Sequence, residues 1–345
     1  MKLLGLSDGR PMGNSEVLLK EAMIAAEEVV KGLEVEVIRL QYLTIKPCIG
    51  CWKCTNSKLK EFHCVFEKTD HMSYLVKKLS EADGLIFSFP SYAISAPSPF
   101  FAIRDRLVAG RRAMEKKIRA TGYIAVGGSE WVNHCLPLVP IWLWGHCKTI
   151  DQMFLPFTAT LGQVALNKEA MARARKVGQN VGKAMMMPAD QMKYVGDGMK
   201  ISDAEIKYLC QTMEMPEDFI RWVMEDEDHC PICHSNMLQL RGRYVRCAIC
   251  DVKGNIEIVD GKIKVTYDEE ELKKVRSGPY EAARHHHLVT HSIKLYVEKK
   301  DEIRKLTQKY VDYGNMSAPP TLPGQKPVNM FLDWEDRQSR RLERK

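Results

Sequence analysis

The alternation of apolar and polar positions in the first half of the chain predicts strands separated by helices. Short apolar runs typical of buried parallel strands occur at residues 2–7, 33–40, 84–89, 121–128 and 149–156. Segments with apolar residues at helical spacing lie between or after them, at residues 15–32, 69–83 and 167–185. Strands that alternate with helices in this way predict an α/β fold, with a doubly wound parallel five-stranded sheet over residues 1–187.

The ends of these helices carry capping signals. We expect Ser15 to cap the first helix, because a serine hydroxyl accepts hydrogen bonds from free backbone N–H groups, and Gly32 to close it. Thr69 or Asp70 is expected to cap the second helix. Further on, the sequence SDAE at 202–205 is a capping box and predicts another helix start.

The second half of the chain divides into shorter segments. Its pattern predicts a helical linker, a small β domain, a C-terminal helical segment and a tail, at residues 188–228, 229–268, 269–313 and 314–345. Two hairpins are expected in the β domain, one turning near Arg241–Gly242 and one at Asp260–Gly261. The tail is rich in proline and then strongly charged, which favours either disorder or an extended arm on a neighbouring subunit.

Composition and charge narrow the class of protein. A hydrophobic content of 45% and a charged content of 28% are ordinary for a soluble globular protein. No charged-then-apolar leader opens the chain, and the longest apolar run, 135–145, is too short for a bilayer, so we expect a cytoplasmic protein without membrane contact. Residues 1–190 carry 25 basic against 18 acidic residues, and the rest carries 26 of each, so we expect no nucleic-acid partner for the second half.

Eight of the eleven cysteines fall in two clusters. In a long chain without a signal peptide, such clusters indicate metal binding rather than disulfides. The other three, Cys135, Cys147 and Cys210, are predicted to be buried apolar thiols.

The first cluster comprises Cys48, Cys51, Cys54 and Cys64. A CxxCxxC run places three soft ligands on one tight loop, and a fourth thiolate completes the set. Three cysteines at successive two-residue gaps are more typical of a [4Fe–4S] cluster than of zinc, which normally uses pairs of CxxC knuckles. Zinc and free thiols remain the alternatives at this point.

The second cluster has the spacing of a zinc ribbon. Two CxxC knuckles, Cys230 with Cys233 and Cys247 with Cys250, are separated by thirteen residues that are expected to form a hairpin. This spacing is a strong signal for structural zinc with four thiolates, and a rubredoxin-like iron site is the alternative. We expect this domain to serve as a scaffold or in oligomerisation.

Three predicted loops carry polar groups at the carboxyl ends of strands, where ligands bind in such sheets. The first, SDGRPMGNS at 7–15, offers hydroxyl, guanidinium and amide groups beside a helix N-terminus, which suits a phosphate. The second, PSYAIS at 90–95, offers Ser91 and Tyr92, and the third, GGSEW at 127–131, allows close backbone approach. Together the three loops predict a mononucleotide site.

The first domain resembles the NADPH-dependent FMN reductase family of flavodoxin-like proteins, and its iron–sulfur flavoprotein branch in particular. The resemblance rests on KLLGLSDGRPMGNSEVLLKEA, IKPCIGCWKC, KTDHM, EADGLIFSFPSYAISAPSPFFAIRDR and YIAVGGSEW, in this order. The chain departs from the family pattern at His71, Ile94, Pro97 and Pro99.

This resemblance implies a set of cofactor contacts. It implies FMN with its phosphate at Ser7, Arg10, Asn14 and Ser15, its ring against Pro90, Ser91, Tyr92 and Ala93, and its other side at Gly127 and Gly128. It also implies a [4Fe–4S] cluster on Cys48, Cys51, Cys54 and Cys64, and a homo-oligomer in which one subunit completes the flavin site of the other.

These features together predict an FMN-dependent iron–sulfur oxidoreductase. Electrons would pass between a donor (ferredoxin or NAD(P)H), the cluster, FMN and a small-molecule or protein acceptor. Candidates for proton delivery are His134, Tyr92 and the run His285–His287. His287 and His291 have a spacing that can hold a metal ion, but we interpret them as part of a polar surface. Two alternatives stay open: an electron carrier or redox sensor without its own substrate, and a zinc-ribbon binding or regulatory protein on a flavodoxin scaffold.

Overall fold

The computed structural model describes residues 1–51, 53–55, 62–92, 95–128, 136, 139, 146–196, 202–224, 230–232, 237–274, 287, 298–299 and 301–302. Several residues of the sequence predictions lie outside these ranges, namely Ala93, Ile94, His134, Cys135, Cys233, His285, His286 and His291. The chain divides into two units, residues 1–283 and 284–345. In the second unit the Lys299 ammonium lies 2.9 Å from a Glu302 carboxylate oxygen.

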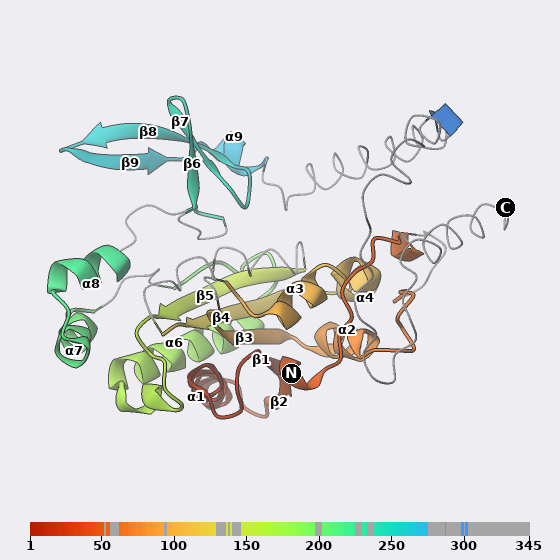
Figure 1. Cartoon of the computed structure of the whole chain (residues 1–345), viewed down its shortest axis with the longest axis horizontal. Helices are drawn as coiled ribbons and strands as arrows, with labels where there is room; N and C mark the ends of the chain where they lie inside the picture. Colours follow the sequence, from red (N-terminus) through yellow and green to blue (C-terminus); the bar gives the residue numbers. More distant parts are fainter. Residues whose placement is uncertain are drawn as a thin grey trace, which may run out of the picture. The chain divides into compact units, whose positions relative to one another are not determined.

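Five parallel strands form the central sheet, in the order β2-β1-β3-β4-β5. The strands are β1 (Lys2–Ser7), β2 (Glu34–Arg39), β3 (Gly84–Pro90), β4 (Arg119–Val126) and β5 (Cys147–Leu155). This order is that of flavodoxin-like sheets, in which the chain reverses its direction of winding between β1 and β3. The predicted α/β fold with a doubly wound five-stranded sheet is confirmed (Figure 1).

Helices cover both faces of this sheet, and each face has its own apolar core. On one face pack α1 (Asn14–Val29) and α6 (Lys168–Met185). On the other pack α2 (Met72–Glu81), α3 (Ser98–Arg104) and α4 (Arg111–Met114). Short 3-10 turns join these elements at Leu40–Tyr42, Lys53–Thr55, Leu107–Gly110 and Gln163–Leu166.

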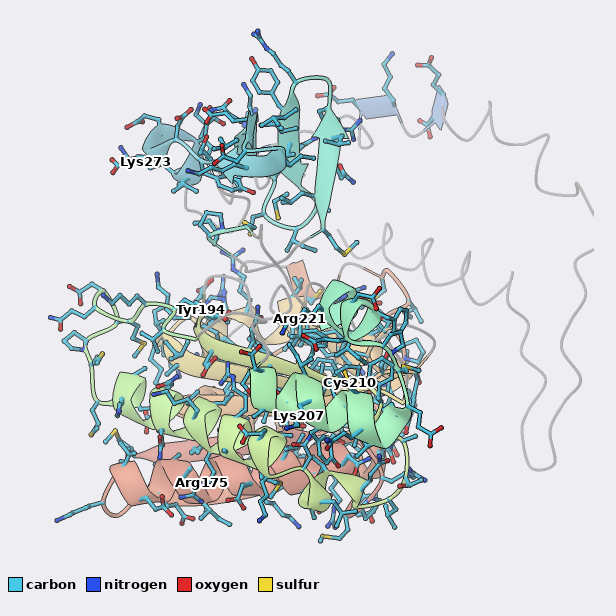
Figure 2. The ribbon with its side chains drawn as sticks, turned by 90° about the vertical axis from the view of Figure 1, so that its left-hand side faces the viewer. Arg175, Tyr194, Lys207, Cys210, Arg221 and Lys273 are labelled. Carbon is cyan, nitrogen blue, oxygen red and sulfur yellow. The ribbon has the colours of Figure 1, made fainter. Side chains whose placement is uncertain are left out.

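Two further helices, α7 (Asp203–Met213) and α8 (Glu217–Met224), follow the sheet in the chain. Ile206, Leu209 and Ile220 from these helices are buried in the core that also contains α2 and α3. Arg221 of α8, labelled in Figure 2, joins the two helices. Its guanidinium lies 2.9 Å from a carboxylate oxygen of Asp203 in α7. Cys210 of α7 packs against the same core, although it is half-buried rather than buried as predicted, and so is Cys147.

The two helices α1 and α6 approach closely because small residues line their contact. A Cβ atom on Gly178 would lie 1.7 Å from the Ala22 carbonyl oxygen, so the contact requires glycine there. At Gly182, one turn further on, a Cβ atom would meet its nearest neighbour, a Val30 methyl group, at 3.3 Å.

The predicted helix caps were right at one position and wrong at three. The first helix ends at Val29 with Val30 as its C-cap, so Gly32 lies beyond the end that it was predicted to close. Ser202 caps α7, and its hydroxyl accepts a hydrogen bond from the Glu205 N–H at 3.2 Å, as the capping box predicts. At α1 the N-cap is Gly13 rather than Ser15, because Ser15 already has helical backbone geometry. At α2 the N-cap is His71 rather than Thr69 or Asp70, although Asp70 still accepts a hydrogen bond from the Met72 N–H at 3.1 Å.

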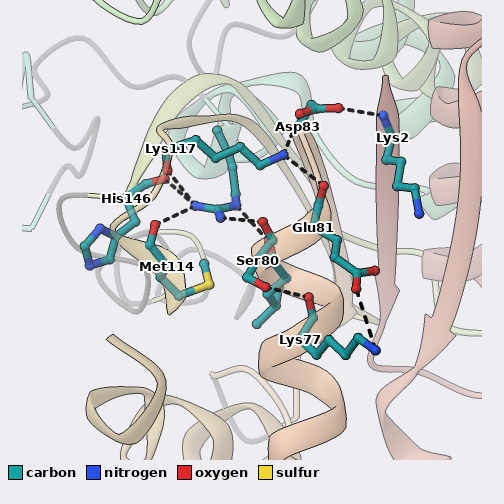
Figure 3. A network of polar contacts seen from close by, with 10 residues as sticks. Lys2, Lys77, Ser80, Glu81, Asp83, Met114, Lys117 and His146 are labelled. Atoms are coloured by element: carbon teal, nitrogen blue, oxygen red, sulfur yellow. Dashed lines mark hydrogen bonds and ion pairs between the residues drawn. The ribbon is translucent and has the colours of Figure 1, made fainter. Parts of the chain in front are cut away.

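Arg119, at the start of β4, is fully buried, and its side chain donates hydrogen bonds to backbone carbonyl groups. Its guanidinium donates to the carbonyl oxygens of Leu79, Ser80, Met114, Lys117 and His146 (Figure 3). Leu79 and Ser80 lie in the last turn of α2, Met114 and Lys117 lie at and just after the end of α4, and His146 directly precedes β5. One side chain therefore satisfies carbonyl acceptors from three segments.

A second, antiparallel sheet contains β6 (Leu238–Arg241), β7 (Tyr244–Cys247), β8 (Lys253–Val259) and β9 (Lys262–Thr266), and α9 (Glu269–Leu272) follows it. Both predicted hairpins are present. Asp260 and Gly261 have φ angles of 53° and 76°, as a two-residue turn with positive φ at both positions requires. No helix among the described residues is long and apolar enough to cross a membrane.

Candidate functional site

The loop after β1 forms a tight turn into α1 at the switch point of the sheet. Ser7, the last residue of β1, is fully buried, and its hydroxyl has no hydrogen-bond partner in the described part of the chain. A Cβ atom on Gly9 would lie 2.4 Å from the Ser15 hydroxyl oxygen. An unsatisfied buried hydroxyl beside a helix N-terminus fits the phosphate end of FMN.

Asn14 and Arg10 tie this loop to the segment that follows β5. The Asn14 amide donates to the carbonyl oxygens of Thr158 and Thr160 at 3.1 and 2.8 Å and accepts from the Val164 N–H at 3.1 Å. Arg10 donates to the Ala159 carbonyl oxygen at 3.3 Å. The Asn14 side chain, predicted to contact phosphate, therefore uses its amide groups to position the loop.

The segment 157–164 is the part of this edge that the sequence did not reveal. Phe157 adopts a φ angle of 54°, and the Gln163 side-chain oxygen accepts from the N–H groups of Ala159 and Thr160 at 3.0 and 3.1 Å. The sequence offered one signal that this segment belongs to the site, namely its position directly after a fifth predicted strand. The carboxyl ends of all strands in a parallel sheet meet at one edge.

The two other predicted loops lie at the same edge. The Ser91 N–H donates to the Val126 carbonyl oxygen at 2.6 Å, which joins the ends of β3 and β4. Tyr92 and Ser95 form a small bridge with each other, and Tyr92 is 48% exposed while the buried Ser95 hydroxyl has no partner among the described residues. Gly127 accepts from the Thr158 N–H at 2.8 Å, and a Cβ atom on Gly128 would meet Ala159 at 3.1 Å.

Asp8 is the unusual titratable group of this edge. Its side chain is fully buried, and neither carboxylate oxygen has a hydrogen-bond partner in the described structure. Burial raises the pKa of Asp8 from 3.8 to about 7, and the nearby Phe100 backbone offsets part of the rise. A carboxyl group of this kind changes charge near neutral pH at the candidate flavin site.

Glu16, in the first turn of α1, has the opposite environment. Arg39 at the end of β2 donates two hydrogen bonds of 2.8 Å to its carboxylate, and the Lys20 ammonium lies 2.7 Å away. Arg39 chiefly, with help from Lys20, holds the pKa of Glu16 at about 2. This pair anchors β2 to α1 and leaves Glu16 charged at any working pH.

The four cysteines of the loop after β2 line one cavity. Cys48, Cys51, Cys54 and Cys64 share it with Ile49, Val65, Phe66, Asp105, Arg106 and Ala109. Burial, together with the nearby Cys51, Cys48 and Cys64, raises the pKa of the Cys54 thiol. Convergence of four thiols on one cavity fits a thiolate-bound metal centre.

Arg106 is the buried cation of this cavity. Its side chain is 1% exposed, and its guanidinium donates to the Cys64 sulfur at 3.1 Å and to the Lys46 carbonyl oxygen at 3.0 Å. It also forms an ion pair with Asp70, whose side chain is fully buried. These contacts join both ends of the cysteine segment to the start of α2 and to the turn after α3.

The spacing of the thiols separates the two cysteine clusters. One zinc ion with Zn–S bonds of about 2.3 Å draws its thiolates to within about 4 Å of one another. The Sγ atoms of Cys230, Cys247 and Cys250 are all buried and within 4.8 Å of one another, which suits a single ion. No such group of three occurs among the described cysteines at 48–64, which suits the wider spacing around a polynuclear cluster.

Residues 1–159 match the model of the NADPH-dependent FMN reductase family. Over these residues the chain is similar to members of this family. The matched residues contain the loops at 7–15, 90–95 and 127–128, and the match supports FMN as the ligand of the edge described above.

Two curated relatives differ in what they share with the chain. An iron–sulfur flavoprotein of Methanocaldococcus jannaschii is 34% identical over 131 residues, which cover 38% of this chain and 64% of that protein, so the chain matches less than two thirds of its length. A flavone synthase of Aspergillus candidus is 26% identical over 297 residues, which cover 78% of this chain and 83% of that protein. The second match extends well beyond residues 1–159.

A solved structure has a similar fold over most of the chain. A protein described as a flavone reductase superposes with a TM-score of 0.65 and 24% identity, and it covers 93% of this chain and 100% of that one. At this identity the likeness concerns the fold alone.

Proposed function

We propose that the protein is a flavin-dependent oxidoreductase that binds FMN at the carboxyl edge of the parallel sheet and a [4Fe–4S] cluster at Cys48, Cys51, Cys54 and Cys64. One observation carries the cluster proposal: four cysteines, three of them in a CxxCxxC run, line one cavity. The family of residues 1–159 carries the flavin proposal.

Different residues of this edge would hold the phosphate and the ring of FMN. Ser7 and Ser15, with backbone N–H groups at the start of α1, would bind the phosphate, and Arg10 lies beside them. Pro90, Ser91, Tyr92 and Ala93 would lie against the ring, and Gly127 and Gly128 would allow its close approach on the other side. Bound FMN supplies the exchange between two-electron hydride chemistry and single-electron transfer.

A structural zinc ion is proposed for the ribbon at 229–268, held by Cys230, Cys233, Cys247 and Cys250. Three of these sulfurs are buried and close together, which supports the proposal, and Cys233 lies outside the described residues. We further propose a homo-oligomer, with ferredoxin or NAD(P)H as the electron donor.

The acceptor is proposed to be a planar conjugated small molecule of the flavone type. The relative named a flavone synthase aligns along 78% of the chain, whereas the iron–sulfur flavoprotein aligns along 38%. The half-exposed Tyr92 ring at the flavin edge offers a stacking surface for such a compound. The reaction class is hydride exchange at a carbon–carbon double bond conjugated to a carbonyl group, with a proton from solvent or the protein completing the addition of two hydrogens.

The first experiment tests the cofactors. Protein purified without oxygen should contain FMN, about four irons and four sulfides, and one zinc per chain. Cys64→Ala should lose the iron and its broad visible absorption and keep the flavin bands. A colourless wild-type protein that holds only zinc would contradict the proposal and favour a ribbon-based binding protein.

The second experiment tests turnover. Reduced protein mixed with flavone under argon should consume it and yield a product heavier by two hydrogens, detected by mass spectrometry. If FMN and cluster are present and accept electrons but no conjugated ketone is reduced with either donor, the electron carrier is the better description.

A further inference from the structure

We infer that Arg106 is a positioning residue of the proposed cluster: it holds the Cys64 thiolate in place and donates a hydrogen bond to its sulfur that raises the reduction potential. This inference rests on the proposed cluster at Cys48, Cys51, Cys54 and Cys64.

The cysteine segment is long, and Arg106 contacts it at both ends. Cys64 follows Cys54 after nine intervening residues, so the local CxxCxxC turn does not fix its position. The Nη2 atom of Arg106 lies 3.1 Å from the Cys64 sulfur, and Nη1 lies 3.0 Å from the Lys46 carbonyl oxygen. One rigid guanidinium therefore sets the distance between the first and the last part of the segment.

Asp70 fixes Arg106 in turn. Its carboxylate pairs with the guanidinium and accepts from the N–H groups of Lys46 and Met72 at 3.0 and 3.1 Å. The Phe66 ring lies 5.3 Å from the guanidinium carbon. Because both charged side chains are almost fully buried, the hydrogen bond to sulfur lies in a medium where it is strong.

A charged donor at this place acts differently on the two oxidation states. Reduction adds one electron, so the reduced centre carries one more negative charge and gains more from an N–H group aimed at its sulfur. Asp70 offsets part of the charge of Arg106. Removal of the arginine and removal of the aspartate should therefore shift the potential in opposite directions.

The test uses three full-length variants, purified without oxygen. Asp70→Asn leaves the arginine with a neutral partner. Arg106→Gln combined with Asp70→Asn removes both charges and leaves two amides that can bond to each other. Arg104→Lys is the matched control, because Arg104 lies two residues away, is half-buried rather than fully buried, and pairs with Asp105 at 3.0 Å. The midpoint potential of the cluster is measured by redox titration followed by electron paramagnetic resonance, with iron and sulfide determined in each sample.

We expect the double variant to lower the equilibrium constant for one-electron reduction about tenfold, a fall of about 59 mV. Asp70→Asn should raise the potential, and Arg104→Lys should leave it unchanged. A purely structural role would reduce the iron content without shifts of opposite sign.

Each outcome decides the inference. Unchanged potentials in loaded variants, or shifts of the same sign, would overturn it. Loss of iron from both Asp70 variants while Arg104→Lys stays loaded would support the positioning of Cys64 and contradict a role confined to the potential. Absence of iron and sulfide from the wild-type protein is a separate result, which contradicts the proposed function itself.

Discussion

At the scale of single residues, two carboxyl groups in neighbouring positions have contrasting environments. Glu16 is paired with Arg39 and Lys20, whereas Asp8 is fully buried and has no partner in the described part of the chain. Pairing lowers the pKa of Glu16 to about 2, and burial raises that of Asp8 to about 7. Both lie where the sheet meets α1, so the charge of this region at neutral pH depends on Asp8.

The first prediction concerns the pH dependence of stability. In the unfolded chain Asp8 has a pKa of 3.8, while in the folded protein it keeps its proton up to about pH 7. The unfolded state therefore binds fewer protons between these values, and the free energy of unfolding falls as the pH rises through this window and is level above it. From pH 5.5 to 8.5 the fall attributable to Asp8 is about 2 kcal/mol, at 1.36 kcal/mol per pKa unit.

Asp8→Asn should remove this contribution, because the amide stays neutral at both pH values. Urea denaturation of the wild-type protein and the variant at pH 5.5 and 8.5 measures it, and the variant should gain stability relative to wild type at the higher pH. The same difference between the two proteins at both pH values would show that Asp8 is ionised in the folded state throughout.

The second prediction concerns Arg119. Arg119→Met keeps most of the side-chain volume but removes the guanidinium that donates to five carbonyl oxygens. The His146 oxygen keeps its bond from the Arg119 backbone N–H at 3.0 Å, whereas the oxygens of Leu79, Met114, Lys117 and Ser80 lose this donor. We expect a loss of about 3–5 kcal/mol in the free energy of unfolding. Arg175→Met is the control, since Arg175 forms surface ion pairs with Glu21 and Glu28 (Figure 2), and it should cost much less. Equal losses in a denaturant titration would argue against the role assigned to Arg119.

At the scale of elements, the strands followed from the sequence and the ends of the helices did not. Continuous apolar runs identify buried parallel strands, and β1 has the predicted bounds, 2–7. Helix caps depend on backbone angles, which composition does not determine. Ser15 is a good capping residue, yet the N-cap of α1 is Gly13. The cysteines at 48–64 were identified from their spacing, but Arg106 and the segment 157–164 reach their sites through tertiary contacts that no local pattern contains.

The third prediction concerns the contact of α1 with α6. A methyl group on Gly178 would lie 1.7 Å from the Ala22 carbonyl oxygen, so Gly178→Ala has to push the two helices apart. We expect a loss of about 3 kcal/mol or more, because overpacking costs more than the gain of about 1 kcal/mol in helix propensity. In Gly182→Ala the added Cβ atom would lie 3.3 Å from its nearest neighbour, a Val30 methyl group, so this variant should change the free energy of unfolding little. Similar unfolding midpoints for the two variants would contradict this account of the contact.

At the scale of the whole molecule, the two cysteine clusters belong to different sheets. The cysteines at 48–64 follow β2 of the parallel sheet, and the buried trio Cys230, Cys247 and Cys250 belongs to a separate small core with Ile249 and Val252. Each proposed metal therefore has its own supporting core, and loss of one should not release the other.

The fourth prediction tests this independence. Cys51→Ser should lose iron and keep zinc and FMN, whereas Cys247→Ser should lose zinc and keep iron and FMN. Metal analysis and flavin absorption of both variants measure it, with the Cys210→Ser variant as control because Cys210 lies on α7 outside both clusters. Loss of both metals from either variant would show that the two sites depend on each other.

The bonds from Asn14 to the segment after β5 have a consequence for biosynthesis. These hydrogen bonds connect residues that are 144 to 150 positions apart in the sequence, and the bond from Arg10 to Ala159 spans 149 positions. Non-local contacts of this kind form late, because the intervening chain must first be ordered. The loop that begins at residue 7 leaves the ribosome well before the segment after β5, yet it reaches its final form only after β5 has been added to the sheet. Flavin capture is thus expected to follow completion of the sheet during synthesis, rather than to guide its early steps.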